Sequence, residues 1–62
     1  MTRTEIRNAA KSIVANHGPY QTYDSGNLFA DERYPDASAA DRAAVAEEAY
    51  RQADRVLEFL GL

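Results

Sequence analysis

Small and apolar residues recur at alternating steps of four and three along the C-terminal third of the chain. The series comprises Ala39, Ala43, Ala46, Tyr50, Ala53, Leu57 and Leu60. This heptad spacing is typical of an α-helix that lies along another helix. Because most side chains in the series are alanines, we expect the helix that packs on them to approach closely.

Start and stop signals bound this long helix to residues 39–60. Ser38 is followed three residues later by Asp41, which is a variant of the capping box found at helix starts. No proline or glycine interrupts the segment, and Gly61 follows its apolar residues. The sequence therefore predicts one continuous helix over the last third of the chain.

A shorter first helix is predicted over residues 3–16. Thr2 and Glu5 have the spacing of a capping box, in which each side chain accepts a hydrogen bond from the other residue's backbone N–H. Gly18 can adopt a positive φ and Pro19 cannot continue a helix, so this pair indicates the end of the helix.

The segment between the helices is predicted to be a long, partly ordered connector. Residues 24–26 read Asp-Ser-Gly, which is a turn signal. Residues 27–33 are expected to form one short helical turn that places Leu28 and Phe29 in the core. The connector also carries three tyrosines, which are Tyr20, Tyr23 and Tyr34.

The predicted fold is an all-α two-helix hairpin in a single domain of residues 1–62. A chain of this length buries only about 60% of the surface that its unfolded form exposes. It has no cysteine for disulfides and only one histidine, so association between chains is the remaining source of stability. We therefore expect a homodimer that resembles a four-helix bundle. The predicted self-association residues are Val45, Ala49, Tyr50, Ala53, Val56, Leu57, Phe59 and Leu60.

Composition and motifs favour a binding protein over an enzyme. No Ser stands in a nucleophile motif, the glycines are isolated, and the acidic residues after Asp24 do not fit a calcium-binding loop. His17 is expected at a helix C-terminus, where the helix dipole favours a partly positive imidazole. We expect no catalytic residue, cofactor or metal. With no apolar run of about 20 residues and no signal peptide, we expect a complete, cytoplasmic protein without a membrane partner.

The aromatic residues of the connector are candidates for protein binding. Tyrosine supplies a large contact area at low entropic cost together with a polar tip, and it is enriched at interfaces. An alternative, which the sequence leaves open, is that these rings fill the core opposite the alanine series. The predicted protein-binding residues are Tyr20, Tyr23, Phe29, Tyr34, Asp31 and Glu32.

Three cations, Arg3, Arg7 and Lys11, lie one turn apart on one side of the first helix. Such a stripe could contact phosphates of a nucleic acid, or it could pair with acidic side chains of the long helix. A nucleic-acid partner is not the first expectation, because binding domains have a basic excess and this chain has a net charge of −3. The negative charge leaves open an acidic DNA mimic that inhibits a DNA-binding enzyme. The candidate acidic partners are Glu47, Asp54 and Glu58.

Two segments carry a resemblance to known proteins. Residues 9–13 read Ala-Ala-Lys-Ser-Ile, and residues 50–57 read Tyr-Arg-Gln-Ala-Asp-Arg-Val-Leu. Together with the variable connector between them, they resemble small uncharacterised helical proteins of actinobacterial phages and their hosts. The resemblance implies a phage-type accessory protein that binds and modulates a partner protein of the host.

Overall fold

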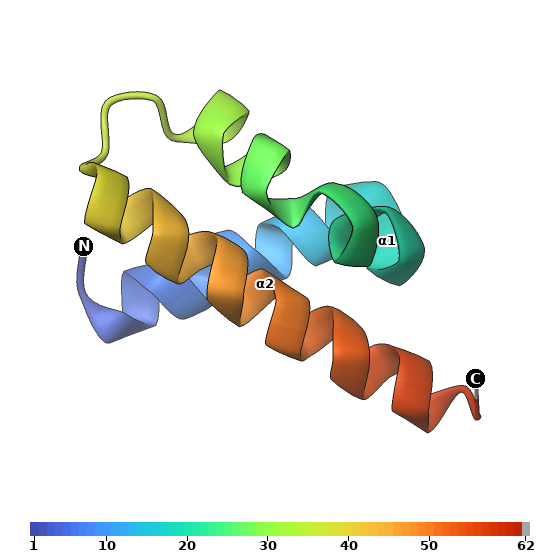
Figure 1. Cartoon of the computed structure of the whole chain (residues 1–62). Helices are drawn as coiled ribbons and strands as arrows, with labels where there is room; N and C mark the ends of the chain where they lie inside the picture. Colours follow the sequence, from blue (N-terminus) through green and yellow to red (C-terminus); the bar gives the residue numbers. More distant parts are fainter. Residues whose placement is uncertain (62) are drawn as a thin grey trace.

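The computed structural model describes residues 1–61 and is all-helical. Helix α1 spans Arg3–Arg33 and helix α2 spans Ala39–Phe59. The two helices pack against each other across the short loop of residues 34–38, and no strand occurs among residues 1–61 (Figure 1). The predicted all-α hairpin is confirmed, and the predicted long helix agrees with α2 to within one residue.

Helix α1 is bent at two residues whose backbone is not helical, Gly18 and Ser25. Gly18 has φ 85° and ψ 162°, a region that essentially only glycine adopts. Pro19 then begins the next helical turn, because its fixed φ suits the first position of a helix. In Figure 1 the chain of α1 runs outward from blue to cyan, turns, and returns in green on the other side of α2. We call residues 3–17 the first arm of α1 and residues 26–33 its last arm.

The prediction of a partly ordered connector is therefore corrected. The breaks fall at the predicted turn signals, but the chain resumes a helical conformation after each of them and continues to Arg33. The last arm agrees with the helical turn predicted for residues 27–33 to within one residue. Leu28 is 59% exposed instead of lying in the core, whereas Phe29 is half-buried and packs against it.

Both helix starts are capped as the sequence predicts. Glu5 N–H donates to Thr2 Oγ1 over 3.1 Å, and Thr2 N–H donates to Glu5 Oε1 over 2.7 Å. At α2, Asp41 N–H donates to Ser38 Oγ over 3.1 Å. The carboxylate of Asp41 is bound to the N-terminal ammonium of Met1 at 2.9 Å. This ion pair holds the starts of the two helices together.

The core is built from small side chains contributed by both arms of α1 and by α2. Ile13 and Val45 are the largest apolar side chains that are fully buried, and the remaining core residues are alanines. Because alanine is short, the helices pack closely along their length. The buried apolar residues are Ala9, Ala10, Ile13, Ala30, Val45, Ala46, Ala49 and Ala53.

This packing corrects part of the predicted self-association surface. Val45, Ala49 and Ala53 have 0% exposure within the single chain, so they cannot contact a second copy without opening the fold. The sequence predicted only one short helical turn in the connector, which is too little to cover this side of α2. The last arm of α1 returns along α2 and contributes Ala30 to the same core.

Candidate functional site

Among residues 1–61, several large apolar side chains are exposed and two hollows lie on the surface. Within this part of the chain, no group of three or more His, Cys, Asp or Glu side chains is placed to hold a metal ion. Among the same residues, no helix combines the length and apolar character that crossing a bilayer requires. The side chain of His17 stacks on Phe29, with ring centroids 3.7 Å apart and planes 5° apart. His17 thus ties the two arms of α1 together.

The predicted protein-binding residues of the connector divide into exposed and structural groups. Tyr20 and Tyr23 are 60% and 56% exposed, and we call this pair the tyrosine surface. Phe29 and Tyr34 are half-buried and pack against the core. Of these four aromatic side chains, Tyr20 and Tyr23 are therefore the most exposed.

The two predicted acidic residues also differ. Asp31 forms an ion pair with Arg42, whose Nε lies 3.2 Å from Asp31 Oδ1. Arg42 also donates to the backbone oxygens of Pro35 and Ala37, so Asp31 helps to hold the loop between the helices. Glu32 is exposed and makes no side-chain hydrogen bond within residues 1–61.

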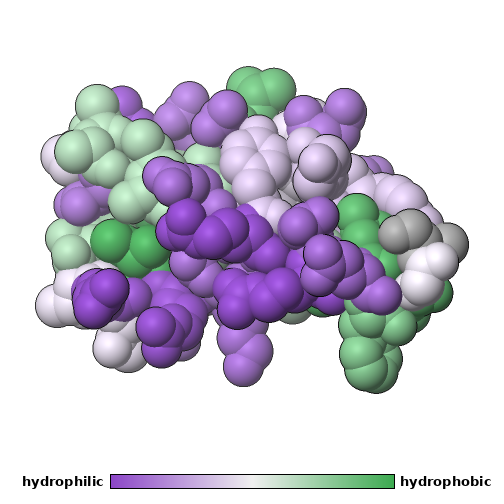
Figure 2. Space-filling view, turned by 60° about the horizontal axis from the view of Figure 1, so that its bottom comes forward, coloured by the Kyte–Doolittle hydropathy of each residue, from purple (hydrophilic) through white to green (hydrophobic). Residues whose placement is uncertain are grey.

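A hydrophobic surface lies at the C-terminal end of α2, where the helix extends past α1 (Figure 1). Phe59 is 90% exposed, Leu60 is 56% exposed and Val56 is 37% exposed. We call these three residues the apolar end. Figure 2 shows hydrophobic side chains gathered at the right-hand end of the molecule, next to a hydrophilic band. Leu57 is half-buried, so the predicted self-association residues still exposed to a partner are those of the apolar end.

The predicted cation stripe lines a trough between the first arm of α1 and α2. The trough consists of two adjoining hollows of about 230 Å³ and 550 Å³. Arg7 and Glu48 line both hollows, Arg3 lines the first and Lys11 lines the second. The remaining lining residues are Ile6, Ala44, Glu47, Arg51, Gln52 and Arg55.

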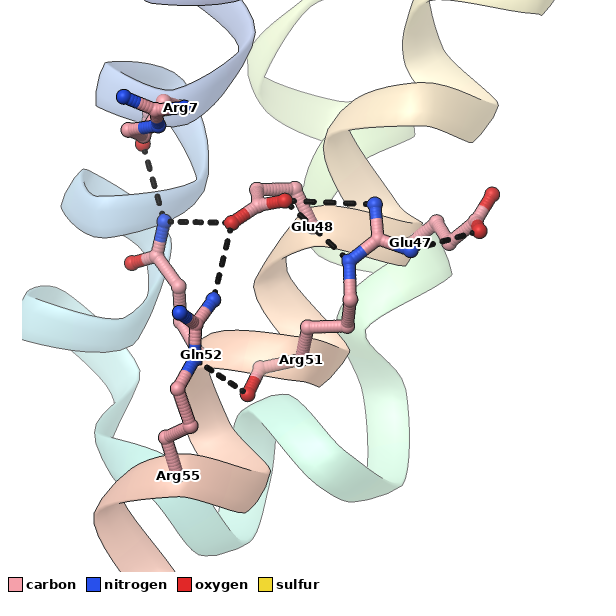
Figure 3. Close-up of polar contacts among 6 residues, drawn as sticks. All are labelled: Arg7, Glu47, Glu48, Arg51, Gln52 and Arg55. Carbon is pink, nitrogen blue, oxygen red and sulfur yellow. Dashed lines mark hydrogen bonds and ion pairs between the residues drawn. The ribbon is translucent and has the colours of Figure 1, made fainter.

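The walls of this trough are held in place by polar contacts centred on Glu48 (Figure 3). Glu48 Oε2 lies 3.3 Å from Arg51 Nη2, and Glu48 Oε1 lies 3.3 Å from Arg55 Nη2. Gln52 Nε2 donates to Glu48 Oε1 over 3.4 Å and to the backbone oxygen of Arg7 over 3.2 Å. The last contact joins α2 to the first arm of α1.

Two acidic residues of the long helix, Glu47 and Glu48, are paired with arginines of the same helix. Arg51 Nη1 also contacts Glu47 Oε1 at 2.9 Å, and hydrogen bonds to Glu47 and Glu48 raise the pKa of the Arg51 guanidinium. Within residues 1–61, the stripe of Arg3, Arg7 and Lys11 forms no ion pair with an acidic side chain. Within the single chain the stripe is therefore not paired with Glu47, Asp54 or Glu58, and pairing with these acids of a second chain stays a prediction.

Arg51 and Arg55 were not among the predicted binding residues. The sequence does contain a feature that could have identified them: they are four residues apart, which places both side chains on one side of α2. That side could be matched with the cation stripe only once the direction of α2 along the first arm was known. No family model matches this chain, and no curated protein or solved structure is significantly similar to it.

Proposed function

We propose that this chain is a small non-enzymatic accessory protein of phage type that binds and modulates a partner protein in the cytoplasm of a host cell. The single observation that carries this proposal is the exposure of large apolar and aromatic side chains at the apolar end and the tyrosine surface. Contiguous apolar patches that remain exposed on a small domain mark interaction sites. Burying one side chain of the size of Phe or Leu contributes about 1.5–3 kcal/mol.

The occupant that fits the apolar end is a second copy of the chain. Val56 and Leu60 follow Ala49 and Ala53 at steps of seven, so they prolong the buried stripe of α2 beyond the part that α1 covers. Two copies that overlap these ends would extend the existing helix packing into a bundle. A chain of this size with a core of small side chains is marginally stable alone, so burial of the apolar ends in a dimer would stabilise the fold.

The tyrosine surface fits a partner protein. Tyr20 and Tyr23 lie three residues apart in one helical segment, so both can contact the same partner surface. The ring of Tyr23 rests on Tyr50, edge to face with centroids 6.4 Å apart, and this contact restricts its motion before binding. A rigid exposed tyrosine loses little entropy when it is buried at an interface.

Self-association is tested by sedimentation equilibrium of the wild-type protein, of Phe59→Asp and of Leu28→Asp. Both variants add one carboxylate at an exposed apolar residue, but only Phe59 belongs to the apolar end. We expect a dimer for the wild type and Leu28→Asp, and a monomer for Phe59→Asp. The wild-type melting temperature should fall over about a hundredfold dilution. A wild-type mass of 6.9 kDa at every concentration would exclude the dimer and leave the tyrosine surface as the only proposed interface.

Partner binding is tested by placing a photo-crosslinking amino acid at position 20 and, as a control, at the exposed Ala43 of α2. The probes are used in an actinobacterial lysate with and without nuclease. We expect one stoichiometric protein at position 20 that survives nuclease, is lost with Tyr23→Ala, and is not captured from position 43. Equal capture from both positions, or capture unaffected by Tyr23→Ala, would contradict a role for the tyrosine surface.

A further inference from the structure

The trough between α1 and α2 gathers most of the positive charge of an acidic protein. Five of the seven Lys and Arg side chains line it, together with only two acidic side chains. The trough therefore carries three net positive charges, whereas the whole chain has a net charge of −3. The cations are Arg3, Arg7, Lys11, Arg51 and Arg55, and the acids are Glu47 and Glu48.

The acidic part of the chain lies outside the trough. No residue between 12 and 43 lines either hollow, and that segment holds five of the ten acidic residues. Exposed charges are largely screened beyond the Debye length of about 8 Å at physiological ionic strength. The charge that a ligand in the trough meets at contact distance is therefore that of the lining residues.

The cations of α1 are left available because the nearest acids are already occupied. Glu47 and Glu48 are paired with Arg51 and Arg55 of their own helix, and the side chain of Glu48 is only 17% exposed. Arg3, Arg7 and Lys11 form no ion pair within residues 1–61 and face the open trough.

We propose that this trough binds the sugar-phosphate backbone of a single nucleic-acid strand. The three free cations of α1 lie four residues apart, so they repeat about every 6 Å along the helix. A ladder of evenly spaced cations suits a chain of evenly spaced anions better than it suits one small ligand. The two hollows share Arg7 and Glu48, so one extended strand that crosses both hollows can contact all three cations of α1.

Guanidinium groups favour phosphate as the anion. Two of the three unpaired cations in the trough, Arg3 and Arg7, are arginines, whose planar fork can donate two hydrogen bonds to one phosphate group. Such contacts are independent of base sequence. This binding site is separate from the apolar end and the tyrosine surface, so it does not rest on the proposed protein-binding function.

The test is fluorescence anisotropy with a labelled oligothymidylate between about 50 mM and 200 mM salt. The variant Arg7→Gln/Lys11→Gln removes two free cations whose side chains make no hydrogen bond within residues 1–61. Arg33→Gln is the matched control, because Arg33 is exposed at the end of α1 and lines neither hollow. Glu47→Gln removes one carboxylate from the wall of the trough.

We expect the double variant to bind roughly tenfold more weakly. Its slope of log K against log salt should be smaller by about 0.7 for each phosphate contact removed. Arg33→Gln should bind as the wild type does, and Glu47→Gln should bind more tightly. Circular dichroism checks that each variant keeps its helix content.

Three results would overturn the proposal: no salt-dependent binding, equal losses in Arg33→Gln and the double variant, or equal competition by polyglutamate of matched charge. The last result would assign the trough to an acidic protein segment. Sedimentation of Phe59→Asp in the same buffer reports on self-association separately, so failure of one proposal is distinguished from failure of the other.

Discussion

The hydroxyl of Tyr50 accepts a hydrogen bond of 3.2 Å from the backbone N–H of Asn27, so a side chain of α2 caps the last arm of α1. The first N–H groups after a helix break have no partner inside the helix, and Asn27 is the second residue after the break at Ser25. Within residues 1–61, no backbone N–H of the last arm donates to the hydroxyl of Ser25, which itself donates to Asp24. Gly26 leaves room for the ring, since a Cβ there would lie 3.2 Å from two ring atoms of Tyr50.

The first prediction is that Tyr50→Phe destabilises the protein by about 1 kcal/mol, the net contribution of one hydrogen bond. For a domain of this size, such a change lowers the melting temperature by about 4–8 °C. Tyr20→Phe is the control, because it removes a hydroxyl from an exposed ring. Equal melting temperatures for Tyr50→Phe and the wild type would show that water replaces the cap at no cost.

The second prediction concerns the turn between the arms of α1. A Cβ at Gly18 would meet no atom within 4 Å, so Gly18→Ala should cost backbone strain alone. We expect a loss of about 1–3 kcal/mol in urea unfolding. Gly61→Ala also places alanine at a positive φ, but after the end of α2 and not between two packed arms, so we expect a smaller loss. Equal stabilities for the two variants would indicate that the turn at Gly18 tolerates an ordinary φ.

The sequence predicted the helix starts, which depend on contacts between residues close together in the chain. Thr2 with Glu5 and Ser38 with Asp41 mark the helix starts by contacts three residues apart, and both are present. It did not predict that α1 continues to Arg33. Pro19 reads equally well as the end of one helix and the first residue of the next, and only packing against α2 decides between these alternatives.

The binding surfaces were harder to predict because they depend on contacts between distant residues. Met1 contacts Asp41, and Arg7, further along the first arm, contacts Gln52, further along α2. The first arm and α2 therefore run in the same direction. This direction places the cation stripe beside Arg51 and Arg55. The exposure of Tyr20 and the burial of Tyr34 likewise depend on how α1 folds back.

The third prediction concerns acid stability. Hydrogen bonds from the backbone and side chain of Thr2 hold the pKa of Glu5 below its ordinary value of 4.5, and the pKa of Asp41 is lowered by the N-terminal ammonium. A lowered pKa in the folded state stabilises the protein above the ordinary value, and this contribution is lost as the pH falls through the folded pKa. We therefore expect the melting temperature to fall below about pH 4.5.

The variant Glu5→Gln separates the contribution of the capping box from that of Asp41. It should lower the melting temperature near neutral pH and show a smaller further decrease on acidification than the wild type. Glu32→Gln is the control, because Glu32 is exposed and its carboxylate makes no hydrogen bond within residues 1–61. An identical acid response in the Glu5 variant and the wild type would mean that the capping carboxylate does not control stability.

The last prediction concerns Thr22, which is fully buried and whose hydroxyl has no hydrogen-bond partner within residues 1–61. A buried hydroxyl without a partner costs about 1–3 kcal/mol. Thr22→Val has nearly the same shape and removes the polar atom, so it should raise the melting temperature. Thr22→Ser keeps the hydroxyl but removes the methyl group, so it should lower the melting temperature through lost packing. A lower melting temperature for Thr22→Val than for the wild type would instead show that the hydroxyl makes a stabilising contact, such as one with a buried water molecule.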